Sequence, residues 1–130
     1  MVEIASYEAV DLDGVLAICA AEGWDTYASD PERAHRVFTA PGVITVVARD
    51  GEDVVGFASV QSDGEIQAHL STIAVAADRR REGIARRLLD LAVTEAGGQR
   101  VDLITDEAED FYASLHHQRW SGFRIYPPFT

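Results

Sequence analysis

The stretch from Val75 to Leu89, VAADRRREGIARRLL, decides the fold of this chain. An apolar segment ends at Val75, an arginine-rich polar loop follows, and a helical pattern begins near Gly83. The small residues Gly83 and Ala85 let backbone N–H groups of the first helical turn approach a ligand closely. Free N–H groups and the helix dipole both favour an anion at that position. The stretch therefore predicts a strand–loop–helix unit that binds phosphate.

The positive charge of the chain is concentrated in the same place. All 11 basic residues are arginines, and five of them lie between residues 79 and 87 with Glu82 as the only acid. That window carries a charge of +4, whereas the whole chain carries −11 and the remainder −15. A positive spot on an acidic protein favours an anionic ligand. The acidic remainder disfavours nucleic acid and anionic membranes as partners.

Apolar periodicity and turn residues extend this unit in both directions. Before it, strands are expected over residues 2–7, 43–48, 54–60 and 65–75, and helices over 11–22 and 30–39. After it, the helix that starts near Gly83 runs to about residue 96, followed by a strand over 101–105, a helix over 107–115 and a strand over 123–126. The order β-α-α-β-β-β-α-β-α-β predicts an α+β fold, with a mixed, mostly antiparallel central sheet and helices on both faces. We expect residues 1–130 to form one domain.

The segment from Val75 to Ala85 resembles the coenzyme A signature of the GNAT superfamily of N-acetyltransferases. That signature is Gln or Arg, two residues, Gly, one residue, then Gly or Ala, placed five residues after a valine or isoleucine that closes a strand. Its positions are matched by Val75, Arg80, Gly83 and Ala85, and the order of elements agrees along essentially the whole chain. The resemblance implies an acetyl-coenzyme A-dependent N-acetyltransferase with these coenzyme-binding residues: Ile73, Ala74, Val75, Arg80, Arg81, Gly83, Ile84, Ala85, Arg86 and Tyr112.

One position departs from the family pattern. Glu82 precedes Gly83, where family members often carry Arg or Lys. A negative charge beside the phosphates weakens binding unless the side chain points into solvent.

The resemblance also implies catalytic roles. It places Tyr112 near the coenzyme sulfur, where a phenol can protonate the leaving thiolate, and the Ile73 N–H beside the acetyl oxygen. In the histone-acetylating branch a glutamate accepts the amine proton, and His69 stands at that position here. Histidine suits the role because its ordinary pKa lies near neutrality. Glu65 or Asp106, acting through a water, stay open as alternatives.

The acceptor side is expected between the first two helices. Trp24 and Tyr27 could face an aliphatic or cationic amine, and Glu22 or Asp25 could pair with its charge. A loop packed by two aromatic residues is the alternative. The acidic surface favours a small amine as acceptor, while a protein acceptor and a homodimer stay open.

Several other features narrow the class of protein. Cys19 is the only cysteine, so no intrachain disulfide is expected, and a reducing cytoplasm is the simplest location. No secretory signal or membrane span is expected from the apolar pattern. No metal is expected either, because the adjacent His116 and His117 point to different sides of a helix. Two alternatives to an enzyme remain: an acyl-coenzyme A sensor without turnover, and an interaction domain that uses the arginine cluster.

Overall fold

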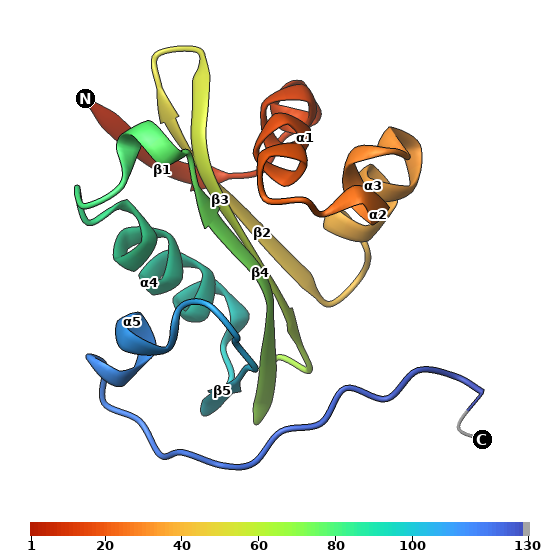
Figure 1. Cartoon of the computed structure of the whole chain (residues 1–130), viewed down its shortest axis with the longest axis vertical. Coiled ribbons are helices and arrows are strands. Elements are labelled where there is room, and N and C mark those ends of the chain that lie inside the picture. Colours follow the sequence, from red (N-terminus) through yellow and green to blue (C-terminus); the bar gives the residue numbers. More distant parts are fainter. Residues whose placement is uncertain (129–130) are drawn as a thin grey trace.

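A five-stranded sheet forms the centre of the computed structural model, which describes residues 1–128 (Figure 1). In spatial order its strands are β1 (Val2–Ser6), β2 (Val43–Asp50), β3 (Asp53–Ser62), β4 (Gln67–Val75) and β5 (Arg100–Asp102). The first four strands pair antiparallel, and β5 pairs parallel to β4. The predicted mixed, mostly antiparallel sheet is confirmed.

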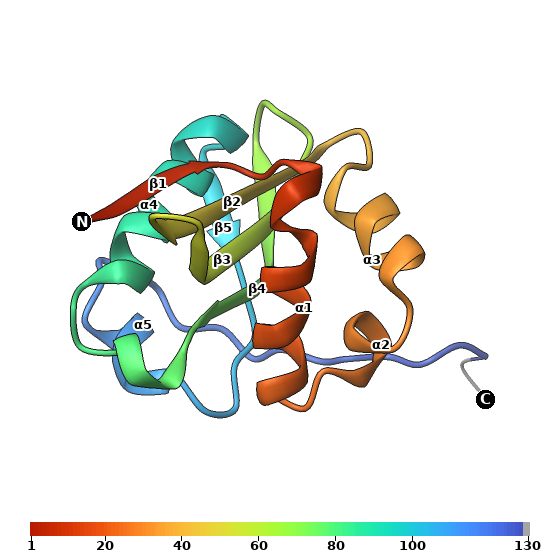
Figure 2. The ribbon, with the colours of Figure 1, turned by 90° about the horizontal axis from the view of Figure 1, so that it is seen from above.

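Helices cover both faces of the sheet, as Figure 2 shows from above. One face carries α1 (Leu12–Ala21), α2 (Asp25–Ala28) and α3 (Pro31–Phe38), and the other carries α4 (Ile84–Ala96) and α5 (Glu109–Ala113). Two short 3₁₀ turns, η1 (Ala9–Asp11) and η2 (Ala77–Arg79), precede α1 and α4. Within residues 1–128, no helix has the length and apolarity needed to cross a bilayer.

Each face has its own hydrophobic core. On the α4 face, Leu88 is fully buried against apolar residues of β2, β3 and β4. On the α1–α3 face, Phe57 of β3 is fully buried and packs edge-on against Phe38 of α3, with ring centroids 5.6 Å apart. We refer to these two sides of the sheet as the α4 face and the α1–α3 face.

The boundaries of the longer helices follow the expected capping residues. The Asp30 carboxylate accepts a hydrogen bond from the Arg33 N–H, and Pro31 occupies the first position of α3. Gly97 ends α4 in the left-handed conformation, with φ of +72°. The sequence prediction of both helices is confirmed.

A β-bulge interrupts β4 at Ser71. Ser59 of β3 pairs with Thr72, and the next residue, Val60, pairs with Leu70, so Ser71 is an extra residue without a partner on β3. The bulge changes the alternation of β4. Leu70 and Val75 both lie in the core of the α4 face. They are five residues apart, and in a strand without a bulge two residues at an odd separation point to opposite faces.

The structure differs from the prediction in three places. Strand β5 stops at Asp102 instead of residue 105, and the one-turn helix α2 was not foreseen. The final strand expected over residues 123–126 is not formed, so that prediction was wrong. The chain after α5 runs past the ends of β4 and β5 without secondary structure (Figure 1), and it leaves Phe123 85% exposed and Ile125 67% exposed. An alternating apolar pattern forms a strand only where a neighbouring strand offers backbone partners.

Candidate active site

The turn before α4 is built as a cradle of backbone donors. Gly83 caps α4 in the left-handed conformation, with φ of +78°, and no side chain caps the helix. Arg81, two residues earlier, also has a positive φ of +66°. A Cβ atom added at Gly83 would meet nothing within 4 Å, so the space beside this residue is open. The first N–H groups of α4 are therefore accessible to an anion, and the turn fits a phosphate group.

The Glu82 side chain is held by an arginine. Arg79 donates from Nε and Nη2 to the two carboxylate oxygens of Glu82, at 3.1 and 3.2 Å, and from Nη1 to Asp50 Oδ2 at 2.9 Å. The hydrogen bonds that Arg79 donates to Glu82 and to Asp50 raise its pKa. Arg79 therefore neutralises the acid that departs from the family pattern, and it is not itself available to a phosphate.

Arg80 connects the same loop to the other face of the sheet. Its Nε donates to the Val75 carbonyl at 3.3 Å, and its Nη2 donates to Glu22 Oε1 at 2.8 Å, just after the end of α1. Arg81 and Arg86 differ from Arg79 and Arg80, because both are exposed and neither forms an ion pair with any residue in the described chain. These two arginines are the side chains free to add charge at the turn.

Near this turn, one edge of β4 has no neighbouring strand in the described structure. β5 pairs only with residues 67–69 of β4, so on that side the remaining backbone of β4 has no strand partner within residues 1–128. Ile73 and Val75 point to the α4 face, while Ala74 packs on the α1–α3 face. Backbone donors and acceptors of Ile73 and Val75 lie in the stretch of β4 that flanks this opening.

Tyr112 of α5 also belongs to the α4 face. Its half-buried ring packs against the core cluster on that side, and the Phe111 ring meets it edge-on with centroids 5.0 Å apart. Burial raises the pKa of the Tyr112 phenol. The group therefore stays protonated at neutral pH and can serve as a proton donor.

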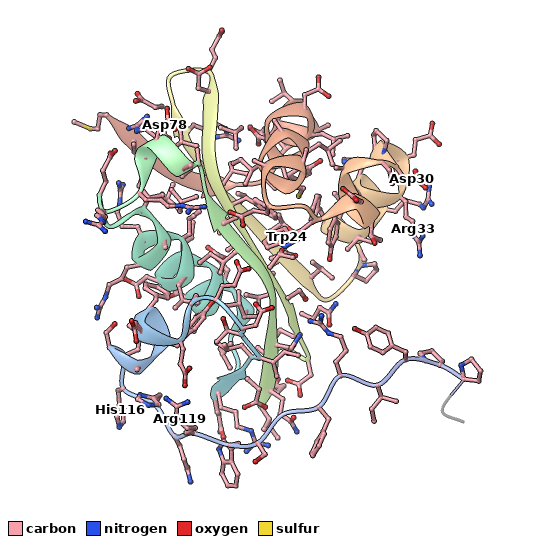
Figure 3. All side chains as sticks on the ribbon, in the orientation of Figure 1. Trp24, Asp30, Arg33, Asp78, His116 and Arg119 are labelled. Carbon is pink, nitrogen blue, oxygen red and sulfur yellow. The ribbon has the colours of Figure 1, made fainter. Side chains whose placement is uncertain are left out.

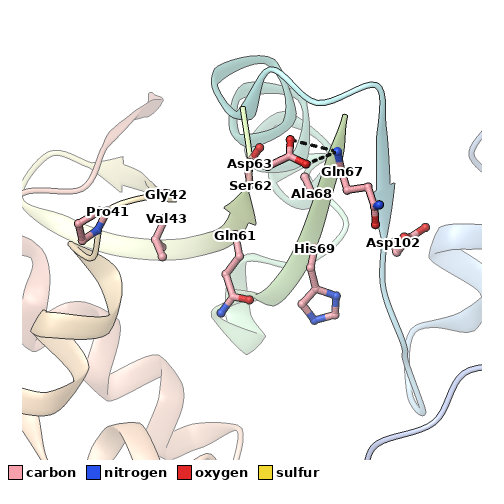
Figure 4. Close-up of a pocket in the computed structure, with 10 residues that line it drawn as sticks. All are labelled: Pro41, Gly42, Val43, Gln61, Ser62, Asp63, Gln67, Ala68, His69 and Asp102. Atoms are coloured by element: carbon pink, nitrogen blue, oxygen red, sulfur yellow. Dashed lines mark hydrogen bonds between the residues drawn. The ribbon is translucent and has the colours of Figure 1, made fainter. Parts of the chain in front are cut away.

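His69 lies on the opposite face, in a pocket at the end of the sheet (Figure 4). In this pocket Gln61, His69 and Asp102 are direct neighbours across β3, β4 and β5. The side chains of Gln61 and His69 project in the same direction (Figure 4). His69 is exposed. The alternative bases Glu65 and Asp106 are also exposed, and both lie outside the strands, in the connections that precede β4 and follow β5.

Three residues expected on the acceptor side lie near the α1–α3 face. The half-buried Trp24 ring meets Phe57 edge-on with centroids 6.3 Å apart, and Figure 3 shows Trp24 between α1 and the sheet. Tyr27 stacks on Phe38 with centroids 5.7 Å apart, so its ring contributes to packing. Asp25 is exposed in the first turn of α2.

The only cysteine, Cys19 of α1, is fully buried. Burial raises the pKa of its thiol to about 11, which makes the thiol a poor nucleophile.

The predicted residues thus form two groups on opposite sides of β4. The α4 face holds Tyr112, Ile73, Val75 and the start of α4, and the α1–α3 face holds His69, Trp24 and Tyr27. Sequence reasoning did not single out the hydroxyls of Ser71 and Thr72, whose oxygen atoms are buried and have no hydrogen-bond partner in the described structure. The available signal was two adjacent polar residues immediately before the apolar end of β4.

Comparisons with known proteins agree with the fold of the chain. A family model described as the acetyltransferase (GNAT) family matches residues 10–123 of the chain. Among solved structures, the chain is similar to a ribosomal-protein-alanine N-acetyltransferase from Brucella melitensis biovar Abortus 2308, with 20% identity, coverage of 96% of this chain and 98% of that one, and a TM-score of 0.77. The curated proteins contain no significant match to the chain.

Two further structures of different function share the fold. One is a transcriptional regulator from Bacillus halodurans C-125, with 20% identity, coverage of 97% of this chain and 99% of that one, and a TM-score of 0.81. The other is an aminoglycoside acetyltransferase from an uncultured soil metagenomic sample, with 20% identity, coverage of 96% and 94%, and a TM-score of 0.78. At this level of identity the likeness extends to the fold alone.

Proposed function

The chain belongs to the acetyltransferase (GNAT) family, and from this premise we propose that it transfers an acetyl group from acetyl-coenzyme A to a primary amine by direct attack on the thioester. The observation that carries the proposal is the open turn at Gly83 beside the unpaired edge of β4. The turn offers donors to a diphosphate, and the strand edge offers backbone partners to an extended amide-containing arm.

Binding of the coenzyme is assigned to the α4 side. The N–H groups at the start of α4 hold the pyrophosphate, with charge added by Arg81 and Arg86. The backbone of Ile73, Ala74 and Val75 pairs with the pantetheine arm. Arg80 helps to shape the loop through its bonds to Val75 and Glu22, and Arg79 keeps the charge of Glu82 away from the phosphates.

Catalysis is assigned to groups that flank the gap between β4 and β5. The bound coenzyme supplies an acetyl thioester with a thiolate leaving group. The Ile73 N–H stabilises the negative charge that develops on the acetyl oxygen. His69 accepts the proton of the attacking amine, and Tyr112 donates a proton to the departing sulfur, so the new C–N bond replaces the C–S bond without a covalent enzyme intermediate.

For the acceptor we propose a small cationic amine. The chain carries a net charge of −11. On the α1–α3 side, Asp25 follows Trp24 at the start of α2, and Asp102 is the neighbour of His69 in the pocket at the end of the sheet. These groups attract a cation and can orient an aliphatic chain.

Two measurements test the proposal. Isothermal titration calorimetry should detect binding of both coenzyme A and acetyl-coenzyme A, and a thiol-release assay should detect turnover with some members of a panel of amines and peptides. Binding without thiol release would support an acyl-coenzyme A sensor. The absence of binding heat, together with an unchanged melting temperature, would contradict the coenzyme site and leave an interaction domain.

A further inference from the structure

A row of three buried hydroxyls crosses the α1–α3 face of the sheet. Thr45 of β2 is the direct neighbour of Ser59 on β3, and Ser59 is the direct neighbour of Thr72 on β4. All three residues are buried, and Thr72 at the end of the row is 9% exposed. The row ends beside the bulge at Ser71, where β4 begins to lack a partner on its other side.

The hydrogen bonds in this row have a fixed direction. Thr45 Oγ1 donates to the Phe38 carbonyl at 2.8 Å, which uses its single proton. The bond of 3.2 Å between Thr45 Oγ1 and Ser59 Oγ must therefore be donated by Ser59. Ser59 then has lone pairs but no proton left to give, so it cannot donate a hydrogen bond to Thr72.

Thr72 Oγ1 has no hydrogen-bond partner, although its atom is buried. A buried hydroxyl without a partner lowers stability, because it loses its bonds to water and gains none in return. Valine would fit the same β-strand position with the same shape and without this cost. The hydroxyl is therefore a feature that folding alone does not explain.

The position of Thr72 connects it to the acceptor side. Because Ser71 is an extra residue, Thr72 follows His69 as the next β4 residue on the α1–α3 face. Its neighbour in register, Ser59, lies two residues from Phe57, which contacts Trp24. Thr72 therefore lies on the acceptor side of β4, and the coenzyme-binding residues Ile73 and Val75 point to the other side.

We propose that Thr72 is an acceptor-binding residue, and that its Oγ1 accepts a hydrogen bond from an N–H group of the amine substrate. The proposal rests on the proposed function and deepens it by naming a specificity-determining side chain. Ser59 has no proton to offer and Thr72 Oγ1 has no partner in the described structure, so its lone pairs are open to a donor on the ligand. A held N–H also directs the nitrogen lone pair for attack.

The experiment compares Thr72→Val with Thr72→Ser and with the wild type. The probes are linear diamines, aminoglycosides and amino-acid amides, assayed by thiol release at saturating acetyl-coenzyme A. Thr72→Val should lower kcat/KM for the amine about tenfold, mainly through KM, which is the effect of one lost hydrogen bond. Thr72→Ser should keep most of the activity, and the affinity for coenzyme A should be the same in all three proteins.

Melting temperatures separate a functional hydroxyl from a structural one. Thr72→Val should melt at or above the wild-type temperature, whereas the control Thr45→Val should melt lower, because it leaves the Phe38 carbonyl and the Ser59 hydroxyl unpaired. A Thr72→Val protein with a lower melting temperature and an unchanged KM would overturn the proposal. A wild type that binds no coenzyme would overturn the proposed function instead, and a wild type that binds it without acetylating any amine would overturn the role of Thr72 in acceptor binding.

Discussion

Arg80 Nη2 donates to Glu22 Oε1 at 2.8 Å, and this ion pair joins the loop before α4 to the residue that follows α1. The loop belongs to the proposed coenzyme site, and the end of α1 leads into the proposed acceptor side. One guanidinium therefore connects the two binding regions across the end of β4, where it also donates to the Val75 carbonyl.

Replacing the acid of this pair should strengthen coenzyme binding. In Glu22→Gln, Arg80 loses its charged partner and becomes available to a phosphate, so the Kd for coenzyme A measured by calorimetry should fall. The Arg80 side chain is largely exposed, so the free energy of unfolding should drop by no more than about 1 kcal/mol. An unchanged or higher Kd would mean that Arg80 is not free to contact the coenzyme even without Glu22.

Gly83→Asp should abolish detectable coenzyme binding, because it adds bulk and negative charge where the phosphate must approach. Gly51→Asp is the matched control, since Gly51 also has a positive φ, of +65°, and also has no atom within 4 Å of an added Cβ. Both variants carry the same backbone strain and charge, and calorimetry should separate them. Wild-type affinity in Gly83→Asp would contradict the location of the site.

Tyr112→Phe should lower kcat about a hundredfold while it leaves the affinity for coenzyme A nearly unchanged. A general acid works only while it is protonated, and burial raises the pKa of Tyr112 above its ordinary value of 10.0. Deprotonation of Tyr112 should therefore lower the activity of the wild type only at a higher pH than an ordinary tyrosine would. Tyr126→Phe, in the exposed C-terminal segment, is the control, and wild-type turnover in Tyr112→Phe would remove Tyr112 from the mechanism.

His69→Ala should change the pH dependence of kcat/KM on the acidic side, because the proposed base is removed. The rate should also fall at neutral pH, while coenzyme binding on the opposite face of the sheet should stay the same. A pH profile identical to that of the wild type would assign the proton to Glu65, Asp106 or solvent.

The ion pair between Asp11 and Arg49 should account for most of the decrease in the free energy of unfolding at acidic pH. Burial raises the pKa of Asp11, but hydrogen bonds from Arg49, at 2.6 and 2.8 Å, and from the Glu8 N–H, at 2.8 Å, outweigh it, so the pKa lies below the ordinary value of 3.8. A lowered carboxyl pKa stabilises the fold at higher pH, and that contribution is lost as the pH falls through the folded-state pKa.

Asp11→Asn should therefore lower the free energy of unfolding by about 3 kcal/mol at pH 7, because Arg49 loses a buried charged partner. Urea denaturation should show that the difference from the wild type is constant from pH 7 to about pH 5 and shrinks below about pH 4. The exposed Asp13→Asn is the control. A difference that stays the same at pH 3 would show that the charge of Asp11 does not stabilise the fold.

The sequence predicted the elements whose signals are local. Capping residues such as Asp30 and Gly97 marked helix ends, and the turn at Asp50-Gly51 connected two β-branched strands. The strand expected over 123–126 failed because its formation depends on a distant partner, and no element of the described chain pairs with it. The bulge at Ser71 was missed for the same reason, since it exists only in the register between β3 and β4.

The turn before α4 could be predicted more fully than the rest of the candidate site. Its residues are contiguous, and the left-handed Gly83 has a sequence signal. The ion pairs of Arg79 with Glu82 and of Arg80 with Glu22 could not be predicted, because they depend on side chains that meet only after folding. The orphan hydroxyl of Thr72 likewise becomes visible only when its neighbours Ser59 and Thr45 are known.

The extra residue in β4 has a consequence for anyone who aligns this chain with its relatives. Upstream of Ser71, odd-numbered positions such as His69 lie on the α1–α3 face, and downstream the even-numbered Thr72 does so. An alignment shifted by a single place across this point would exchange the two faces of the sheet in every residue assignment that follows. Gap placement at Ser71 therefore determines whether a role transferred from a relative reaches the correct side of the protein.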